Sequence, residues 1–384
     1  MKYNNLNIIC KTTNKCNANC TYCFDKVTHG KFNSVISYDI LIEAFTKFCK
    51  WTENLDWTWH GGEPLLMDIK LFDRVMNKFY QIAEREQTNI SFSVQSNGIL
   101  LNEEWEQILD KYNISFGLSY DGYTNKRSRG YELNKLSYLD ANGIILIINK
   151  SNVDLLWENY YQFNRDNKNV NFNFNFSVDN KSFLGDNMYA IKRYRDFILK
   201  YIDDKDAVEC GGERTANELI KLALGYMPNV CNYDNCFKSN ILCLNTNGDI
   251  YKCDETEHEE LKIINISQCN SIDDIFKNEK YLKLQNKWLN INNNKKCNVC
   301  EYNNIICNRG CLARSLVETN LTVPYSLYCL LLKELIPVVF EKLSDLSPEE
   351  FVNLNPNVKN LLIQNHYIPI SILEKAKETV NVLY

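Results

Sequence analysis

The sequence lacks three features that would place the chain in other classes of protein. The formal net charge is −5 and no run of Lys and Arg occurs, so there is no basic footprint of the kind that binds nucleic acid. The N-terminal segment MKYNNLNIIC has neither a long apolar run nor a small-residue cleavage site, so no export signal is visible. The most apolar late stretch, 327–340, is interrupted by Lys333, Glu334 and Pro337 and predicts a docking helix instead of a membrane span. A cytoplasmic protein with no nucleic-acid or membrane partner is therefore expected.

Cysteine, in contrast, is abundant, with 16 residues in the chain. Thiols stay reduced inside cells, where clustered cysteines favour metal binding or redox chemistry over disulfides. Four cysteines have no spacing partner and are predicted to be core thiols: Cys10, Cys49, Cys210 and Cys269. The other twelve fall into groups, which directs attention to metal chemistry.

Short β-rich runs alternate with amphipathic segments through the first half of the chain. Strands are predicted at 6–10, 55–59, 90–95, 114–118, 144–149 and 170–178. Helices are predicted at about 38–50, 69–86, 103–111, 133–142, 154–165 and 187–203. These six βα units predict an α/β fold in which a parallel sheet curls into a partial (β/α)6 barrel. In such folds the loops after the carboxyl ends of the strands carry the site.

Three cysteines follow the first predicted strand, where that rule expects a site. Cys16, Cys20 and Cys23 form a CxxxCxxC loop. Three thiolates on one short loop can bind three irons of a [4Fe–4S] cluster and leave the fourth iron open. A structural zinc ion would require a fourth ligand.

With Tyr22 before its last cysteine, this loop resembles the signature of radical S-adenosylmethionine (SAM) enzymes. In that family the open iron is chelated by the amine and carboxylate of SAM. Gly61, Gly62 and Glu63 follow the second strand and resemble the GGE motif that holds the methionine amine. By themselves these residues are equally compatible with a tight turn. The longer HGGEPLL segment looks like that of the subgroup with a cluster-rich C-terminal domain.

Polar, glycine-closed segments end the third and fourth strands as well. By resemblance, Gln95, Asn97 and Ser119 line the cofactor or substrate pocket. Arg129 is the candidate for the cofactor carboxylate, and Arg127 is an equal alternative. Ordinary turn chemistry also explains the Asn-Gly and Asp-Gly pairs at these strand ends.

The cysteine spacing after residue 230 resembles that of the SPASM domain, which carries two auxiliary clusters, with one residue inserted into the usual CX2CX5CX3C pattern. Asn247 and Gly248 predict a hairpin turn that brings Cys253 back toward the preceding strand. The alternative is a pair of structural zinc sites, because CxxC pairs also bind zinc. The resemblance implies one cluster on Cys297, Cys300, Cys307 and Cys329, and a second on Cys236, Cys253, Cys311 and either Cys231 or Cys243. Cys243 lies in an apolar run and favours a core position, so Cys231 is the preferred fourth ligand.

The length of 384 residues allows one large domain and a smaller one. The expected organisation is a radical SAM partial barrel at 1–205, a linker or helix at 206–230, a SPASM domain at 231–330 and a helical tail at 331–384.

Asp254 directly follows Cys253, so its carboxylate is expected beside an auxiliary cluster. There a raised pKa would let it take a proton from a substrate radical. The same Cys-Asp step occurs in enzymes that convert a Ser or Cys of sulfatases to formylglycine. A solvated acidic loop is the competing interpretation, because several more acidic residues follow: Glu255, Glu257, Glu259 and Glu260.

The resemblance implies three [4Fe–4S] clusters, SAM, a flavodoxin- or ferredoxin-type electron donor and a peptide or protein substrate. A deoxyadenosyl radical would take a hydrogen atom from a substrate carbon, and an auxiliary cluster would accept the second electron or ligate a substrate thiolate.

Two features bear on the substrate. The first strand begins close to the start of the sequence, which leaves no room before it for the leader-binding domain of many peptide-maturing relatives, and the length is close to that of the sulfatase-maturating type. His60 and Asp25, however, stand where that type commonly has Gln and an aromatic residue. Oxidative crosslinking, by a thioether or C–C bond, of a ribosomally made peptide is therefore the first interpretation. Formylglycine formation is the second, and a non-catalytic metal-binding scaffold is the third.

Overall fold

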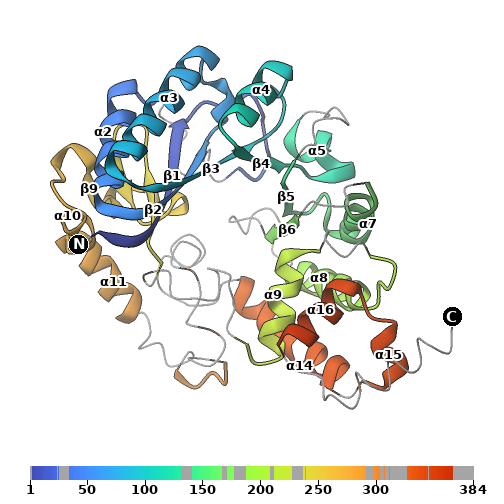
Figure 1. Ribbon diagram of the computed structural model, residues 1–384. Coiled ribbons are helices and arrows are strands. Elements are labelled where there is room, and N and C mark those ends of the chain that lie inside the picture. Colours follow the sequence, from blue (N-terminus) through green and yellow to red (C-terminus); the bar gives the residue numbers. More distant parts are fainter. Residues whose placement is uncertain are drawn as a thin grey trace. The chain divides into compact units, whose positions relative to one another are not determined.

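A computed structural model of the chain (Figure 1) describes residues 2–23, 25, 34–130, 141–166, 171–176, 187–207, 212–226, 237, 239–290, 298–302, 307, 311, 327–344 and 346–365. The chain divides into two compact units. The first comprises Met1–Ser119, Arg129–Asn142 and Cys236–Ile291, and the second comprises Tyr120–Ser128, Gly143–Asn235 and Asn292–Tyr384.

Parallel strands form the centre of the first unit. They are β1 (Tyr3–Thr13), β2 (Thr52–Gly61), β3 (Asn89–Ser96) and β4 (Ile114–Ser119), which lie side by side in the order β4-β3-β2-β1. On its other edge β1 pairs in parallel with β7 (Ile241–Leu244), and the sheet continues through antiparallel β8 (Asp249–Tyr251) and β9 (Ile264–Asn265). All four parallel strands end at the same edge, so the loops that follow them lie close together.

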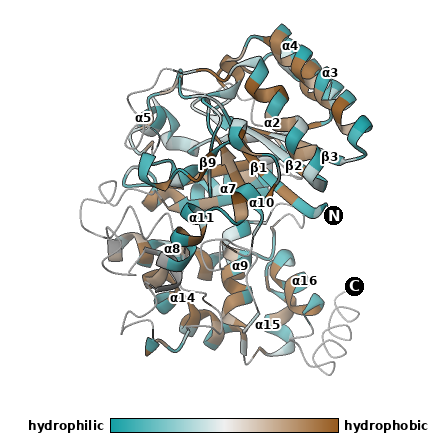
Figure 2. Cartoon of the chain, turned by 90° about the vertical axis from the view of Figure 1, so that its left-hand side faces the viewer, coloured by the Kyte–Doolittle hydropathy of each residue, from teal (hydrophilic) through white to brown (hydrophobic). Residues whose placement is uncertain are grey.

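Amphipathic helices cover this sheet. They are α2 (Tyr38–Trp51), α3 (Ile69–Glu86) and α4 (Glu103–Lys111), and short helices α10 (Asp273–Phe276) and α11 (Glu279–Asn290) follow later in the unit. Each of the first three begins at a side-chain cap: Ser37, Asp68 and Asn102 accept hydrogen bonds from backbone N–H groups of the first turn. In Figure 2 brown and teal stretches alternate along α3 and α4. Their apolar faces therefore turn toward the strands.

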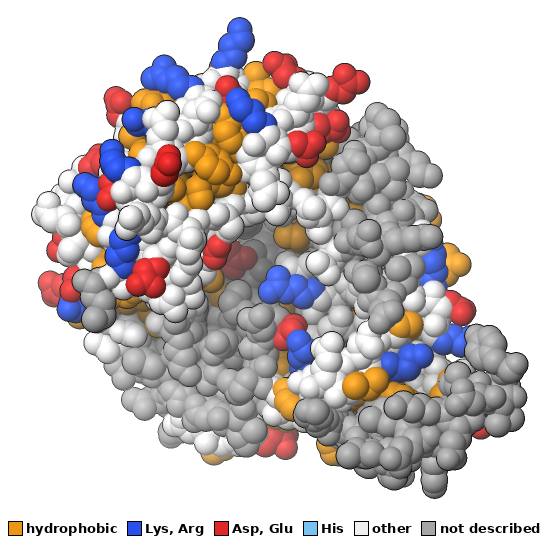
Figure 3. Space-filling view, viewed as in Figure 1, with side chains coloured by type: hydrophobic (Ala, Val, Ile, Leu, Met, Phe, Trp, Pro, Cys, Tyr) orange, Lys and Arg blue, Asp and Glu red, His pale blue; other side chains and the backbone are white. Residues whose placement is uncertain are grey.

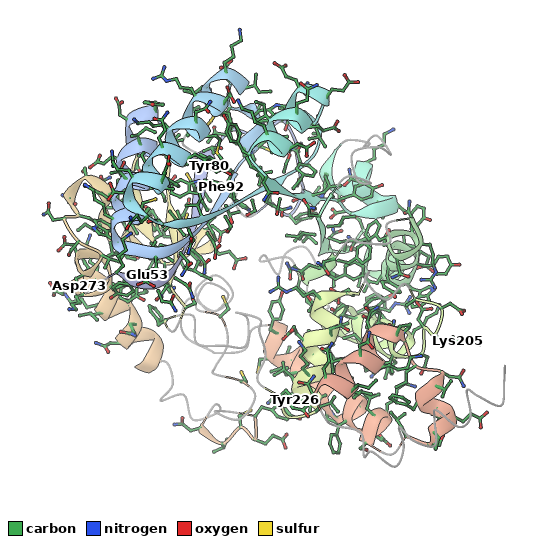
Figure 4. All side chains as sticks on the ribbon, in the orientation of Figure 1. Glu53, Tyr80, Phe92, Lys205, Tyr226 and Asp273 are labelled. Atoms are coloured by element: carbon green, nitrogen blue, oxygen red, sulfur yellow. The ribbon has the colours of Figure 1, made fainter. Side chains whose placement is uncertain are left out.

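The core between these helices and the sheet is aromatic. The ring of Phe79 stacks on Phe45 and on Trp59, with centroids 3.6 and 5.6 Å away, and all three side chains are fully buried. At the margin, Tyr80 lies against Phe92 with centroids 5.7 Å apart (Figure 4). Large rings in mutual contact bury much apolar area, so this core fixes the helices on one face of the sheet.

The second unit contains β5 (Gly143–Ile148), paired in parallel with β6 (Asn171–Phe176). Its main helices are α7 (Leu156–Asp166), α8 (Asn187–Ile202), α9 (Arg214–Ala223), α14 (Leu327–Ser344), α15 (Pro348–Val352) and α16 (Pro356–Gln364), and α5 (Asn125–Arg129) lies at its boundary with the first unit. Phe and Asn alternate along β6, with the Phe side chains buried, which confirms that the Asn residues form one polar face.

The structure confirms an α/β fold built on parallel strands, with all six predicted strands and five of the six predicted helices. Of the predicted helix 133–142, residues 133–140 lie outside the described part and the last two residues are not helical. The predicted hairpin at Asn247 and Gly248 joins β7 to β8, and Gly248 has a φ of +86°. Segment 327–340 belongs to α14, which packs on α8 and α9, and none of the described helices is long and apolar enough to cross a membrane.

Charge on the visible surface is mixed. Lys and Arg side chains alternate with Asp and Glu over the described part of the face in Figure 3. This distribution agrees with the small net charge of −5.

Candidate active site at the tricysteine loop

The tricysteine loop begins directly after β1, and N–H groups point at its sulfur atoms. The Sγ of Cys16 accepts from the backbone N–H of Ala18 at 3.4 Å and from the Nδ2 of Asn97 at 3.7 Å. The Sγ of Cys20 lies 3.9 Å from the Nη1 of Arg129. Donors of this kind compensate the negative charge of thiolates and tune the potential of a cluster.

Burial and nearby groups shift the pKa of the Cys16 thiol in opposite directions. Burial raises the pKa of Cys16, Glu63 and Cys23 raise it further, and the donors from Ala18 and Asn97 act in the opposite direction. Within the described ranges, no group of three His, Cys, Asp or Glu side chains is placed to hold a single metal ion. Three thiols with amide and guanidinium donors fit the thiolate set of a [4Fe–4S] cluster.

Gly61, the last residue of β2, and Gly62 contact the start of this loop. The N–H of Gly62 donates to the carbonyl of Thr13 at 2.7 Å, and the N–H of Glu63 donates to the carbonyl of Lys15 at 2.9 Å. A Cβ at Gly62 would lie 2.1 Å from the Lys15 oxygen, and one at Gly61 would lie 2.4 Å from the Thr13 oxygen. Gly61 also has a φ of +121°. The glycines are therefore required by a close approach of two backbone segments.

Glu63 is fully buried at the junction of β2 and β3. Its Oε1 accepts from the N–H of Leu65 at 2.9 Å and the hydroxyl of Ser96 at 2.8 Å, and its Oε2 accepts from the N–H of Asn97 at 2.8 Å. Burial raises the pKa of this carboxyl, and the three donors partly offset that effect. The carboxylate thus links two strand ends and retains lone pairs for a further donor such as an ammonium group.

The other predicted pocket residues meet at the same edge of the sheet. The amide of Gln95 donates to the hydroxyl of Ser119 at 2.8 Å, across β3 and β4. Asn97 donates to the side chain of Asn17 at 2.8 Å as well as to Cys16, so it anchors the tricysteine loop to the end of β3. The structure therefore brings all three residues to the edge where the loop lies.

Of the two candidate arginines, Arg129 contacts the loop. Its side chain is buried, its guanidinium carbon lies 5.5 Å from the ring centroid of Tyr22, and its carbonyl accepts from the N–H of Asn19. Arg127 belongs to the other unit of the chain. These contacts favour Arg129 as the cofactor-binding arginine.

Cys253 and Asp254 form the turn after β8. Thr256 closes this turn: its hydroxyl donates to the carbonyl of Cys253 at 2.7 Å and accepts from the N–H of the same residue at 3.1 Å. Asp254 is half-buried, and Glu257 at the end of the turn is buried, so this part of the acidic segment is not a solvated loop. Glu259 and Glu260 are exposed.

Glu257 forms an ion pair that the sequence did not predict. Its Oε2 lies 3.0 Å from the Nζ of Lys11, whose side chain is fully buried and also contacts Asp25 at 2.6 Å. One feature of the sequence could have indicated this pair: Lys11 lies in the apolar run of β1, at the end of the strand that is next to the tricysteine loop.

The cysteines of the C-terminal half are only partly described. Cys300, Cys307, Cys311 and Cys329 lie in the second unit, and Cys253 lies in the first. Cys231, Cys236 and Cys297 lie outside the described residues, so both auxiliary ligand sets stay predictions.

Cys243 is fully buried in β7, and its thiol donates to Glu257 at 3.0 Å, which agrees with a core position. Three of the predicted core thiols, Cys10, Cys49 and Cys269, are buried, and Cys210 falls outside the described part of the chain.

Fold and site together fit an enzyme with an iron–sulfur cluster on the loop after the first parallel strand. Residues 10–143 match the family model of the radical SAM superfamily, so this part of the chain is a radical SAM domain. The family implies a [4Fe–4S] cluster and SAM as cofactors of this domain.

Among known sequences, the chain is similar to the cysteine-type anaerobic sulfatase-maturating enzyme of Clostridium novyi. The two are 25% identical over 330 residues, which cover 79% of this chain and 87% of that one. The serine-type anaerobic sulfatase-maturating enzyme of Klebsiella aerogenes is 26% identical over 110 residues, or 28% of this chain and 27% of the relative.

Solved structures share the fold over most of the chain. Native anSMEcpe with bound AdoMet and Cp18Cys peptide superimposes with a TM-score of 0.69 at 20% identity, covering 88% of this chain and 97% of that chain. SuiB of Streptococcus suis, bound to S-adenosylmethionine, gives a TM-score of 0.56 at 16% identity and covers 84% of this chain and 75% of that chain.

Proposed function

We propose that the protein abstracts a hydrogen atom from a ribosomally made peptide and forms an oxidative thioether or C–C crosslink in it. The observation that carries this proposal is the tricysteine loop, whose sulfur atoms accept N–H groups from Ala18, Asn97 and Arg129. A peptide or protein substrate is supported by the similarity to the Clostridium novyi maturase over 79% of the chain and by the peptide-bound structure with the same fold.

In this proposal Cys16, Cys20 and Cys23 hold the first cluster. A cluster held there together with SAM would supply radical chemistry able to remove a hydrogen atom from an unactivated C–H bond. The remaining binding roles fall to the residues at the strand ends: Gly61, Gly62, Glu63, Gln95, Asn97, Ser119 and Arg129. They orient the cofactor and exclude water from the reacting atoms.

The C-terminal half would complete the oxidation. We assign one auxiliary cluster to Cys297, Cys300, Cys307 and Cys329, and the other to Cys231, Cys236, Cys253 and Cys311. Asp254 would accept the substrate proton beside the second of these clusters, and a flavodoxin- or ferredoxin-type protein would donate electrons. The domain limits that follow are 1–205 for the barrel, 206–230 for the linker, 231–330 for the SPASM domain and 331–384 for the tail.

Crosslinking is preferred over formylglycine formation because of two residues that each adjoin Lys11. Asp25 and His60 are the positions at which the chain departs from the sulfatase-maturating type. Asp25 is ion-paired with Lys11, and His60 is the register partner of Lys11 across β1 and β2. Because both positions adjoin Lys11 next to the tricysteine loop, we attribute the departure at these two positions to a different substrate group.

Formylglycine formation is the second candidate, favoured by the number of sulfatase-maturating relatives. The third interpretation, a non-catalytic scaffold, is set aside because the chain contains a radical SAM domain and is similar to sulfatase-maturating enzymes.

The test is an anaerobic reaction of the reconstituted enzyme with SAM, a strong reductant and a panel of peptides, including small ones encoded beside its gene. A peptide two hydrogens lighter that does not react with an aldehyde-trapping hydrazine supports crosslinking. A product trapped by the hydrazine contradicts crosslinking and establishes formylglycine formation. Peptides that remain unchanged while deoxyadenosine forms contradict both reactions for the substrates tested.

A further inference from the structure

A buried ammonium group lies at the end of β1, next to the tricysteine loop. The side chain of Lys11 has no exposed surface, and its Nζ lies 2.6 Å from the Oδ1 of Asp25 and 3.0 Å from the Oε2 of Glu257. Burial acts to lower the pKa of Lys11, but the carboxylates of Asp25 and Glu257 outweigh it and raise the pKa. Lys11 is therefore a permanent positive charge inside the first unit.

Glu257 is held from two neighbouring strands. Its Oε2 contacts Lys11 of β1, and its Oε1 accepts from the thiol of Cys243 in β7 at 3.0 Å. β1 and β7 pair in parallel at this level of the sheet, so both contacts come from a rigid support. The side chain of Glu257 has no exposed surface, so the end of the Cys253–Glu257 turn is fixed in position.

The start of the same turn is fixed as well. Lys252 is buried, and its Nζ donates to the carbonyls of Ser239 at 2.9 Å and Ile241 at 2.8 Å. Lys252 therefore holds the chain just before Cys253, and Lys11 holds it just after Asp254. Asp254 is near enough to Lys11 for its charge to contribute to the electrostatic environment of the ammonium group.

Asp25 is the second carboxylate in contact with the ammonium group of Lys11. It stands two residues after Cys23, and its side chain is 16% exposed. The ammonium group thus joins the segment that ends the tricysteine loop to the segment that follows Cys253. A paired charge of this kind is costly to desolvate, so it is weak evidence for stability alone and is better explained by a positioning role.

We propose that Lys11 is a positioning residue that fixes the Cys253–Asp254 turn relative to the tricysteine loop through Asp25 and Glu257. Its consequence is that a substrate carbon activated at the loop is presented in register to the groups that complete the oxidation. This inference rests on the proposed function, because it assigns the turn a part in the second half of the reaction.

The test compares Lys11→Met, Lys11→Arg and the control Lys47→Met. Lys47 belongs to the same unit and pairs with Glu43 at 2.7 Å, but its side chain is 22% exposed and lies on α2. We expect Lys11→Met to form deoxyadenosine at close to the wild-type rate, while peptide product falls by about 10- to 100-fold, as misplacement of reacting groups does. The ratio of deoxyadenosine to peptide product therefore rises in Lys11→Met. In Lys11→Arg part of the product formation returns, and in Lys47→Met the ratio stays at the wild-type value.

A second measurement does not depend on peptide turnover. In a Cys16→Ala, Cys20→Ala, Cys23→Ala background the first cluster is absent, and the midpoint potential of the remaining clusters can be followed by EPR. Lys11→Met is expected to shift one potential to a more negative value, because a positive charge near the Cys253 turn is lost. Lys47→Met is expected to leave the potentials unchanged.

Lys11→Met alone leaves the carboxylate of Glu257 buried without its ammonium partner and can destabilise the fold. The double variant Lys11→Met, Glu257→Leu removes both members of the buried pair and so controls for that effect. A folded double variant with the wild-type product ratio, or unchanged potentials in the single variant Lys11→Met, would overturn the positioning role. If the wild-type enzyme oxidises no peptide, the proposed function fails, and the potential still decides the role of Lys11.

Discussion

At the residue scale, the side chain of Glu63 holds the ends of β2 and β3 together. It accepts hydrogen bonds from Leu65, Ser96 and Asn97, and it has no exposed surface. The sequence predicted a carboxylate for an ammonium group, and the structure adds a second role, since the same carboxylate joins β2 to β3. Donors left unpaired inside a protein cost more than the bond itself contributes.

Glu63→Ala should therefore destabilise the protein before any cofactor is considered. It leaves three buried donors without their acceptor, and we expect the free energy of unfolding to fall by about 3 kcal/mol. Urea denaturation of the cluster-free protein measures this change. Glu84→Ala, at an exposed position on α3, is the matched control and should change it by less than about 0.5 kcal/mol. Equal effects of the two variants would show that Glu63 does not anchor the strand ends.

Gly62→Ala should act on the tricysteine loop itself. The added Cβ would lie 2.1 Å from the carbonyl oxygen of Lys15, so the loop must shift. We expect the first cluster to bind poorly, and iron per chain to fall while the fold, followed by circular dichroism, is kept. Gly143→Ala is the control, because its Cβ would meet its nearest neighbour at 3.7 Å. Full iron content in Gly62→Ala would contradict the close approach.

At the element scale, Glu213 caps α9 (Arg214–Ala223) and ties it to β6. Its carboxylate accepts from the N–H groups of Phe174, Thr215 and Ala216 and from the hydroxyl of Tyr194. Burial raises the pKa of Glu213 to about 7, against the lowering effect of these donors. The folded protein therefore binds a proton that the unfolded chain has released between pH 4.5 and 7.

Stability should accordingly fall as the pH rises through that window. A pKa raised from 4.5 to about 7 corresponds to about 3 kcal/mol that is present below pH 4.5 and lost by about pH 7. We expect the melting temperature of the wild type to decline across this range relative to that of Glu213→Gln, which has no such proton to bind. Parallel curves for the two proteins would contradict the assigned pKa.

The elements themselves were largely predictable, and their long-range partners were not. Hydrophobic periodicity located α2 and α3 almost to the residue, because their burial follows a local pattern, whereas β2 begins three residues before and ends two residues after the predicted 55–59. The hairpin of β7 and β8 was visible at Asn247 and Gly248, but its pairing with the edge of β1 was not. That pairing joins residues more than 200 positions apart, and nothing in the local sequence of either strand specifies it.

The same limit explains which site residues were found. Motif spacing identified Cys16, Cys20 and Cys23, whose relation is local. Lys11 escaped notice because its partners, Asp25 and Glu257, are far apart in the sequence and meet only in the folded sheet. A buried charge is recognisable only when the residues that pair with it are known.

At the scale of the whole molecule, the proposed function requires three clusters on one chain. The iron content of the wild type should fall by about one third when Cys16, Cys20 and Cys23 are all replaced by Ala, because one of three four-iron clusters is lost. Iron and labile sulfide analysis after anaerobic reconstitution measures this. Loss of almost all iron would show that the C-terminal half holds no cluster.

Formation of deoxyadenosine and formation of peptide product should depend on different cysteines. Cys300→Ala removes a proposed auxiliary ligand and leaves the tricysteine loop intact, so deoxyadenosine should still form while peptide product is lost. Mass spectrometry of both species in one reaction tests this. Normal product formation by Cys300→Ala would remove that cysteine from the ligand set.

The most direct measurement is deoxyadenosine formation by the wild type and by Cys16→Ala, each reconstituted without oxygen and supplied with SAM and a strong reductant. We expect steady formation by the wild type and none above background by Cys16→Ala, because the loop then lacks one of the three thiolates proposed to hold its cluster. Equal formation by the two proteins would contradict the claim that this loop is the catalytic centre.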